Sequence, residues 1–558
     1  MSRRPRVVLF RANSVDTDSR AKKLGMTLTR LGYDVHLLSA EPDRSTAGVR
    51  HLLAVTADGP AGVTIHPVPI GTTHRDLLRH KIAHRRRRQF RFLYWGSKDE
   101  YVTRVREARG VLRRTSRRDP RRLVVLAALL ARSARWRAQW AVNVSHRLAW
   151  RHWDEARANS TRLATTHGVL PELEDYADAF APVLDRLAPD VIHAHHPLVL
   201  GIAVRAARRL RAQGRDTRVI YDAREDFAGL PVQEQGRRRR HAALVREEAR
   251  HIGEVDAVVT VSEPIARTLA ERYRLPALPT VVLNAPVDDP ARHPGGAAVA
   301  ATPTVRQVIG LPDAVPLLVY SGAVSRARGV DVLIRALAHL PGVHAVVVPV
   351  PHPHPHLPAL HELAAGLGVG GRFHVAPPVD QDHLLHYLSG ADLAVFPIRT
   401  GSPNIEQALP NKLFESVHAH LPIVTCDARL IADFVTEHDL GEVFSFGTAG
   451  GSSPVGPGKS PEAESAPDRD EAAAADLARA VRRGLEHPRD PSGAHWQQVR
   501  RHYSWQGQEG AIRQVYGSLS VPPTPDGIEV EPFGSLMLHP GEGPARLTSI
   551  TALDGRSS

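Results

Sequence analysis

Short apolar runs alternate with amphipathic, helix-length segments along most of this chain, and the alternation starts twice. In the first half, runs at 6–10, 34–38, 63–68, 190–194, 218–221 and 257–261 are typical of buried strands. In the second half, runs at 317–320, 343–348, 372–375, 393–397 and 423–426 repeat the pattern. Because such alternation is typical of parallel sheets covered by helices, we predict an α/β fold of two Rossmann-like, doubly wound domains.

Length and composition suggest where the domains begin and end. At 558 residues, 42% of them hydrophobic, the chain is long enough for two cores. We assign 1–288 to an N-terminal domain with a basic amphipathic helical insertion at about 74–158, and 289–304 to a Pro-, Gly- and Ala-rich linker. A second domain covers 305–494, with a disordered excursion predicted at about 447–474, where Gly, Ser, Pro and acidic residues accumulate. A closing helix at 495–519 and a disordered tail at 520–558 follow.

The insertion combines arginine with aromatic residues. Its arginine runs are interleaved with Phe90, Trp95, Trp136, Trp140 and Trp150, among others. Helices with Trp and Leu on one side and Arg on the other can lie in the interface of an anionic membrane, and the net charge of +13 favours anionic partners. The alternative is a helical segment that packs on its own domain with a solvated basic face. Nucleic acid would accept the same charge, but no known nucleic-acid-binding module is present, so we do not expect it.

Three features of the sequence indicate the cellular compartment: the single cysteine, the start of the chain and the length of its longest apolar run. Cys426 lies in a buried-strand pattern and excludes an intramolecular disulfide, which fits a reducing environment. The chain enters its first strand without the apolar core of a signal peptide. The longest apolar run, 123–131, is about half of the roughly 20 residues that cross a bilayer. We therefore expect a cytoplasmic protein, peripheral on the inner face of the plasma membrane if the insertion binds lipid.

The stretch 404–426 has the character of a ligand site. A polar loop leads into a helix opened by Pro410 and Asn411, and a buried strand follows at 423–426. Glu415 lies among the apolar residues of this helix, where a carboxylate is normally avoided, so something polar must meet it. A loop that feeds a helix N-terminus commonly binds phosphate, and Lys412 lies beside this terminus. Lysine is rare in this arginine-rich chain, which is consistent with a need for a compact charge but does not establish it.

Two other classes of site lose support. The first strand lacks the Gly-rich fingerprint of dinucleotide binding, which disfavours hydride transfer. His352, His354 and His356 alternate with proline in an extended loop, without a carboxylate or cysteine cluster that would suit a metal. We therefore predict neither a cofactor nor a metal.

Several motifs carry a family resemblance. The second half contains SGAVSRARGVDVLIRAL, ADLAVFP and LPNKLFESVHAHLPIV, and the first contains DVIHAHH, VIYDAREDFAGL, VDAVVTVSEPIA and VVLNAP. In this order they resemble the GT-B glycosyltransferases of the retaining family 4 type, also described as glycosyltransferase group 1. The resemblance implies two domains that face a central cleft, the first on the acceptor side. It also implies retaining transfer of a sugar from a nucleotide-sugar to a glycan, lipid-linked or other glycoconjugate acceptor.

The resemblance also implies the residues that face the transferred sugar. The family has two glutamates separated by seven residues, and the second, which usually contacts the nucleotide ribose, matches Glu415. The first then falls on Gln407, with Glu406 one residue away, so either could face the sugar. His195 matches the family histidine near the reacting centre. We take His195, Glu406 and Gln407 as the candidate catalytic residues.

The donor side departs from the family pattern at one cation. Arg328 matches the family lysine on the diphosphate, whereas Ala323 stands where an arginine is common, and Arg326 is a plausible substitute. Gly322 would allow close approach of the backbone to the ligand. The predicted nucleotide-binding residues are Gly322, Arg326, Arg328, Lys412, Leu413 and Glu415.

Because Gln407 and Ala323 depart from the pattern, a second hypothesis stays open. It is a catalytically degenerate GT-B protein that acts as a membrane or partner docking module. An epimerase acting on the nucleotide-sugar is a third possibility, which the family 4 motif order disfavours.

Overall fold

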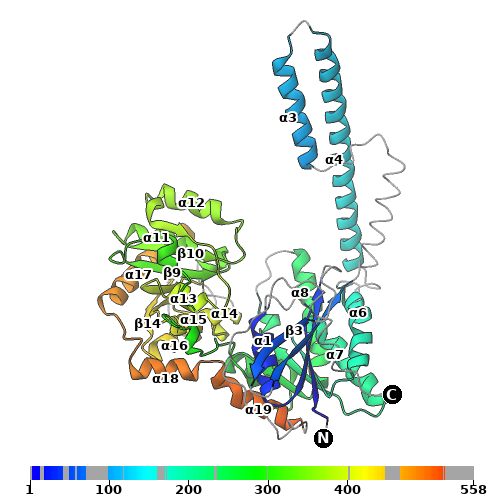
Figure 1. The fold of residues 1–558 in the computed structure, drawn as a ribbon, viewed down its shortest axis with the longest axis vertical. Helices are drawn as coiled ribbons and strands as arrows, with labels where there is room; N and C mark the ends of the chain where they lie inside the picture. Colours follow the sequence, from blue (N-terminus) through cyan, green and yellow to red (C-terminus); the bar gives the residue numbers. More distant parts are fainter. Residues whose placement is uncertain are drawn as a thin grey trace, which may run out of the picture.

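The computed structural model contains two α/β domains and a long helical hairpin that projects from the N-terminal domain (Figure 1). It describes residues 3–12, 18–41, 50–56, 59–70, 98–116, 119–159, 170, 172–230, 235–297, 299–399, 403–446, 466–519 and 521. The tail predicted at 520–558 lies almost wholly outside these residues, as do 74–97 of the predicted insertion.

The N-terminal sheet has the strand order β3-β4-β2-β1-β5-β6-β7-β8. Its strands are β1 (Arg6–Phe10), β2 (Asp34–Glu41), β3 (Arg50–Thr56), β4 (Gly59–Pro69), β5 (Val191–Ala194), β6 (Arg218–Ala223), β7 (Ala257–Thr260) and β8 (Thr280–Val281). Neighbouring strands are parallel except β3 and β4, which pair antiparallel. The edge strand β3 was not predicted from the sequence. The prediction of a parallel, doubly wound sheet is otherwise confirmed.

Helices cover both faces of this sheet because its strands alternate their apolar side chains. Val7 and Leu9 of β1 pack with Leu24 of α1, whereas Val8 and Phe10 pack with Phe180 of α6 on the opposite face. The helices of this domain are α1 (Ser19–Arg30), α3 (Lys98–Arg114), α4 (Arg121–Asn159), α6 (Glu172–Leu187), α7 (Pro197–Ala212), α8 (Gln235–His251) and α9 (Glu263–Tyr273).

The second sheet is parallel throughout, with the order β11-β10-β9-β12-β13-β14. Its strands are β9 (Leu317–Gly322), β10 (His344–Pro349), β11 (Phe373–Val375), β12 (Leu393–Phe396), β13 (Ile423–Cys426) and β14 (Gly441–Phe444). Its helices are α10 (Val305–Val308), α11 (Val330–Ala338), α12 (Leu357–Gly366), α13 (Leu384–Leu388), α14 (Pro403–Gln407), α15 (Asn411–His418), α16 (Arg429–Glu437) and α17 (Ala466–Glu486). One continuous core fills this domain.

The predicted closing helix is in fact interrupted. The structure has α18 (Ala494–His502), a short 3-10 turn at Gln506–Gln508 and α19 (Glu509–Ser518) instead of one helix over 495–519. The chain crosses here from the second domain to the first. The Trp505 backbone N–H donates to the Pro286 carbonyl (2.7 Å) and its indole N–H to Thr27 Oγ1 (2.9 Å). These tertiary bonds replace the hydrogen bonds of a continuous helix.

The predicted disordered excursion was also too long. Residues 447–465 lie outside the described part, but α17 begins at Ala466 and Ala473 and Ala474 are fully buried. Two of the acidic residues that suggested disorder, Asp470 and Glu471, lie near the start of this helix, and Asp470 forms an ion pair with Arg399 at 2.8 Å. A short acidic run therefore marked a helix start, where negative charge is favoured.

The helical hairpin consists of α3 and α4. Tyr101 of α3 stacks on Trp136 of α4, with ring centroids 4.7 Å apart, and Arg122 Nη1 donates to the Thr115 carbonyl at 3.0 Å. Together the two helices extend away from both sheets (Figure 1). Within the described chain, no helix combines the length and apolar character that a membrane span requires.

Candidate active site

Each sheet has a point where the chain reverses its direction of strand addition, and candidate residues lie at both points. In the first sheet this point falls between β1 and β5, and His195 directly follows β5 and donates its backbone N–H to the Phe10 carbonyl at 2.9 Å. In the second it falls between β9 and β12, and Gly322 ends β9. Ligands of open α/β sheets bind at such points, beyond the carboxyl ends of the strands.

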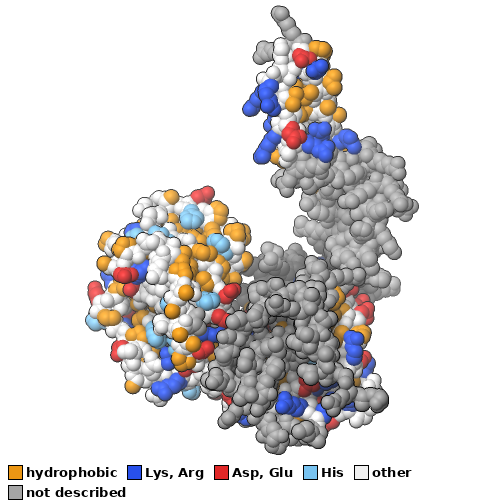
Figure 2. Space-filling model, viewed as in Figure 1, with side chains coloured by type: hydrophobic (Ala, Val, Ile, Leu, Met, Phe, Trp, Pro, Cys, Tyr) orange, Lys and Arg blue, Asp and Glu red, His pale blue; other side chains and the backbone are white. Residues whose placement is uncertain are grey.

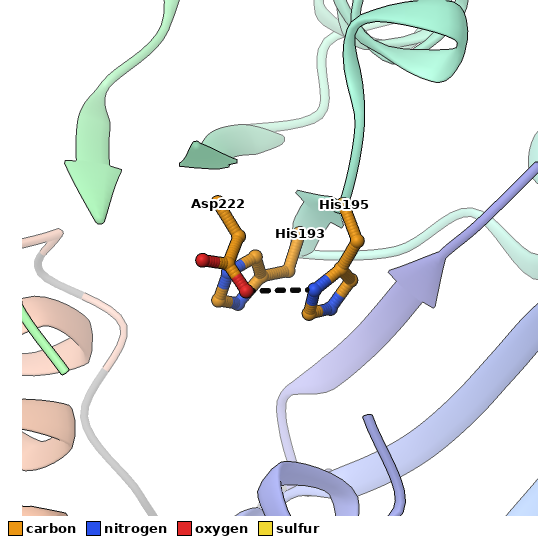
Figure 3. Close-up of side chains that lie close together, drawn as sticks. All are labelled: His193, His195 and Asp222. Atoms are coloured by element: carbon orange, nitrogen blue, oxygen red, sulfur yellow. Dashed lines mark hydrogen bonds and ion pairs between the residues drawn. The ribbon is translucent and has the colours of Figure 1, made fainter. Parts of the chain in front are cut away.

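His195 belongs to a buried network of charged residues on the N-terminal side (Figure 3). Its Nδ1 lies 2.9 Å from Asp222 Oδ2, and its ring stacks on His193 with centroids 4.5 Å apart. Arg20 of α1 forms a two-pronged ion pair with Asp222, with Nε–Oδ2 at 2.8 Å and Nη2–Oδ1 at 3.1 Å. The parity of β5 and β6 places these side chains on the face covered by α1 and α19.

This network sets the proton positions. Burial alone would raise the pKa of Asp222, but Arg20, His195 and Arg224 hold it well below its usual range. Burial lowers the pKa of His195 to about 3, against the opposing effect of Asp222. Arg224 Nη2 also lies 2.9 Å from His195 Nδ1. This nitrogen either donates to Asp222 or accepts from Arg224, so only one of the two contacts is a hydrogen bond in a given tautomer. The ionised Asp222 favours a hydrogen on Nδ1.

The second ring nitrogen of His195 is therefore a hydrogen-bond acceptor. Nε2 is buried and has no hydrogen-bond partner within the described residues. A buried acceptor of this kind is costly to leave unpaired. It is suited to receive a hydrogen bond from a hydroxyl group of a substrate.

Lys23 extends this set of cations toward the second domain. Its Nζ donates to Asn284 Oδ1 at 3.0 Å and to the Ala285 carbonyl, and lies 4.8 Å from the centre of the Trp505 ring. Burial and the neighbouring Arg20 lower the pKa of Lys23 to about 7, while Glu415 of the second domain raises it. Lys23 and Glu415 therefore influence each other electrostatically across the two domains.

On the second domain, Gly322, Lys412 and Glu415 are brought together as predicted from the sequence. Gly322 has a φ of 141°, a conformation that favours glycine, and a Cβ there would lie 3.6 Å from Lys412 Cε. Lys412 Nζ contacts Glu415 Oε2 at 2.7 Å. Glu415 is 5% exposed, and the buried Leu413 helps to anchor α15. Among the described residues no side chain caps the N-terminus of α15 at Pro410. The Leu413 backbone N–H donates to the Pro410 carbonyl at 3.0 Å, whereas the N–H groups of Asn411 and Lys412 can meet an anion.

The two arginines predicted for the diphosphate lie at the edge of this group. Arg326 and Arg328 form a 3-10 turn, and both are exposed. Burial raises the pKa of Glu225 in the first domain, and Arg328 opposes that rise. Arg328 is therefore near enough to the first domain to act on Glu225 electrostatically, whereas no described contact links the Arg326 side chain to that domain. The Arg326 carbonyl accepts from Arg399.

Glu406 and Gln407 are both engaged by protein groups. Glu406 Oε2 accepts a hydrogen bond from the Arg429 backbone N–H at 3.0 Å, at the start of α16. Gln407 faces α9 of the first domain: Oε1 accepts from Thr268 Oγ1 at 3.2 Å, and the Gln407 carbonyl accepts from Ser262 Oγ at 2.5 Å. The structure thus gives Gln407 a role as a link between the domains, which the sequence did not predict.

Two groups of described residues have the spacing of metal ligands, but each is arranged as an ion-pair network. His193, His195 and Asp222 have ligand atoms within 4.8 Å of one another, and Arg20 and Arg224 already contact the carboxylate. In the group of Asp288, His293 and His418, Arg500 donates to His293 Nδ1 at 3.1 Å. This bond leaves the hydrogen of His293 on Nε2, 2.9 Å from Asp288 Oδ1, where a metal would need a lone pair.

Sequence reasoning missed Arg20, Lys23, Asp222 and Arg224 as site residues. Two signals were present in the sequence. Arg20 and Lys23 are three residues apart in α1, on a face that the sheet buries. Asp222 also lies near the carboxyl end of β6, the edge where ligands bind.

Comparisons with known proteins agree with this geometry. Residues 175–289 match the Glycosyltransferase Family 4 model, and residues 315–449 match that of the Glycosyl transferases group 1. A D-inositol 3-phosphate glycosyltransferase of Mycolicibacterium gilvum is 29% identical over 217 residues, which cover 35% of this chain and 47% of the relative. The corresponding Mycolicibacterium smegmatis protein is 25% identical over 201 residues, covering 35% and 45%. The chain thus spans about half the length of the curated relatives that it matches.

A solved structure shares the fold. Sucrose-phosphate synthase from Thermosynechococcus elongatus superposes with a TM-score of 0.55 at 14% sequence identity, over 93% of this chain and 99% of that one. The two parallel-sheet domains and both family matches support a GT-B glycosyltransferase of the family 4 and group 1 type.

Proposed function

We propose that this protein is a retaining glycosyltransferase that moves a sugar from a nucleotide-sugar to a glycan, lipid-linked or other glycoconjugate acceptor. The observation that carries the proposal is the grouping of Gly322, Lys412 and Glu415 beside the uncapped start of α15. A glycine without a Cβ, a lysine ammonium and the first backbone N–H groups of a helix suit a diphosphate, and the adjacent carboxylate suits the ribose hydroxyls.

The chemistry assigned to these groups is the stabilisation of charge. As the bond between sugar and nucleotide breaks, negative charge grows on the diphosphate, where Lys412, Arg328 and the α15 terminus would receive it. In the retaining reaction proposed here, the acceptor hydroxyl attacks from the face that the diphosphate leaves, and a diphosphate oxygen takes its proton. His195 Nε2, held by Asp222, would accept a hydrogen bond from a hydroxyl of the transferred sugar.

The membrane part of the proposal rests on the α3 and α4 hairpin. An acceptor linked to lipid would be presented at the inner face of the plasma membrane, and a basic amphipathic segment would bring the enzyme to it.

Calorimetric titration with a panel of nucleoside diphosphates tests the donor site. We expect one member of the panel to bind, and Glu415→Gln and Lys412→Ala to weaken it roughly 10- to 100-fold, because each removes a charged hydrogen bond. Glu471→Gln on α17, where the side chain is 50% exposed, is the matched control and should bind normally. Absence of binding and of sugar release from every nucleotide-sugar tried would exclude the enzyme.

A second candidate function is a catalytically degenerate GT-B protein that serves as a membrane or partner docking module. It is favoured by Glu406 and Gln407, because both side chains are bonded to protein groups in the positions where the family faces the sugar. Turnover separates the two candidates: a degenerate protein could bind a nucleotide but would transfer no sugar.

A further inference from the structure

The far end of the helical hairpin exposes large apolar side chains. Leu123 and Val124 in the first turn of α4 are each 70% exposed, and Leu130, about two turns further along the helix, is 63% exposed. Val111 near the end of α3 is exposed as well. We call Val111, Leu123, Val124, Leu126 and Leu130 the apolar tip. Clusters of exposed apolar residues at one end of a projecting element are typical of interaction surfaces.

A basic hollow adjoins the apolar tip. It has a volume of about 400 Å³ and is lined by Arg109, Leu112, Arg113, Thr115 and Arg122. Arg122 also holds the end of α3, since its Nη1 donates to the carbonyls of Leu112 and Thr115. Arg109 and Arg113 are exposed and lie one turn apart on α3, so both guanidinium groups can turn toward one ligand. Figure 2 shows basic and hydrophobic side chains next to one another on this part of the hairpin.

We propose that the hairpin tip docks on an anionic lipid bilayer, with a lipid phosphate headgroup in the basic hollow and the apolar tip in the acyl region. This inference deepens the membrane part of the proposed function and rests on it. Guanidinium groups bind phosphate through paired hydrogen bonds, which a lysine would not reproduce. The apolar side chains beside them would leave water at the depth where a headgroup meets its acyl chains.

The combination favours lipid over the other anionic partners. Nucleic acid would bind the arginines through its phosphates but would leave Leu123 and Val124 in water. A free phosphate would likewise satisfy the hollow alone. A second copy of the chain would cover the apolar side chains but would bring like charges together. Only a bilayer with anionic headgroups satisfies both surfaces.

Co-sedimentation of the full chain with vesicles tests the charges. We expect binding to vesicles that contain phosphatidylglycerol and little binding to pure phosphatidylcholine. Arg109→Gln combined with Arg113→Gln should weaken binding roughly thirtyfold, since each arginine near an anionic surface contributes about a factor of five. The matched control is Arg267→Gln combined with Arg479→Gln, which removes the same charge from exposed positions on α9 and α17 and should bind like the unmodified chain.

A second experiment tests whether the apolar tip enters the bilayer. Cys426 is the single cysteine and is fully buried, so a polarity-sensitive dye attached to Leu123→Cys would report on the tip alone. We expect a blue shift of its emission with anionic vesicles. A dye at Leu278→Cys, an exposed position in the loop between α9 and β8, is the control and should not shift.

Several results would overturn the proposal. The first is that the hairpin double variant and the control double variant bind vesicles equally well, and the second is that the dye at position 123 shows no blue shift. The others are that millimolar inorganic phosphate abolishes vesicle binding, or that the chain prefers a single-stranded oligonucleotide to vesicles. The double arginine variant should release sugar from a soluble nucleotide-sugar at the normal rate. Absence of vesicle binding by the unmodified chain, with normal turnover, would refute docking alone, and normal vesicle binding by that chain without turnover would refute the enzyme alone.

Discussion

The substitution Asp222→Asn would test the charged network behind His195. It keeps the shape of the side chain and removes its charge. Arg20, only 2% exposed, would then lose its one described carboxylate partner, and Arg224 would keep Asp18. Unlike the ionised Asp222, an asparagine amide can either donate or accept, so it would not fix which nitrogen of His195 carries the hydrogen.

The contacts set the expected size of the effect. An arginine and a carboxylate about 4 Å apart attract each other by about 4 kcal/mol at an effective dielectric of 20. Asp222 faces Arg20 through two bonds of 2.8 and 3.1 Å and Arg224 at 3.4 Å, but desolvation offsets part of this attraction. Removing one partner of a buried pair costs about 3–5 kcal/mol. We expect the free energy of unfolding of the N-terminal domain to fall by that amount.

Urea unfolding followed by tryptophan fluorescence measures this change, since Trp505 is buried against the N-terminal sheet. The control is Asp185→Asn, whose carboxylate pairs with Arg209 at 2.9 Å with both side chains about 40% exposed. That pair should contribute less than about 1 kcal/mol. If the two variants unfolded at the same urea concentration, the buried network would not stabilise the domain. Slower sugar release by Asp222→Asn, with normal nucleotide affinity, would locate the catalytic effect at His195.

Two further predictions concern pH and backbone geometry. Because the pKa of His195 is lowered to about 3, its contribution to folding is complete above about pH 6.5 and decreases as the pH falls toward 3, by about 1.4 kcal/mol per pH unit. The difference in unfolding free energy between pH 7 and pH 5 should therefore be about 2 kcal/mol smaller for His195→Gln than for the unmodified chain, and an equal difference would contradict the pKa. Gly329→Ala should destabilise the second domain by at least about 2 kcal/mol in the same urea assay, because its Cβ would lie 1.7 Å from the Pro397 carbonyl oxygen at a φ of 67°. Gly368→Ala has a similar φ of 70° and nothing within 4 Å, so it should cost only about 1 kcal/mol, and equal losses would mean that the backbone shifts to admit the methyl group.

Local patterns in the sequence predicted most of the elements and supplied the candidate residues on the second domain. Ser262 precedes the Glu-Pro start of α9, a pattern typical of a helix N-cap, and its Oγ accepts from the Ile265 N–H at 3.3 Å. The helix start at Pro410 and the strand Ile423–Cys426 were likewise confirmed. Such features depend on a few neighbouring residues, which a pattern can capture.

The rest of the site depends on contacts between distant residues. Arg20 and Asp222 are 202 positions apart, and each is unremarkable in its own segment. Gln407 was read as a sugar ligand from its spacing to Glu415, but its contact with Thr268 arises only when the domains meet. The acidic start of α17 was misread because composition alone does not show that Ala473 and Ala474 pack into a core.

The length of α4 sets a distance between any surface that holds the hairpin tip and the two sheets. Its 39 residues extend over about 58 Å, at 1.5 Å per residue. Among the described residues, α3 accompanies it from the tip as far as the stacked pair of Tyr101 and Trp136. An upright hairpin would act as a rigid spacer between the lipid and the site. The enzyme would then add sugar to acceptor chains long enough to reach the site, whose ends stand well clear of the lipid. A hairpin lying flat would lower the site onto short acceptors, so the tilt of one helix would decide which lengths of glycan can grow.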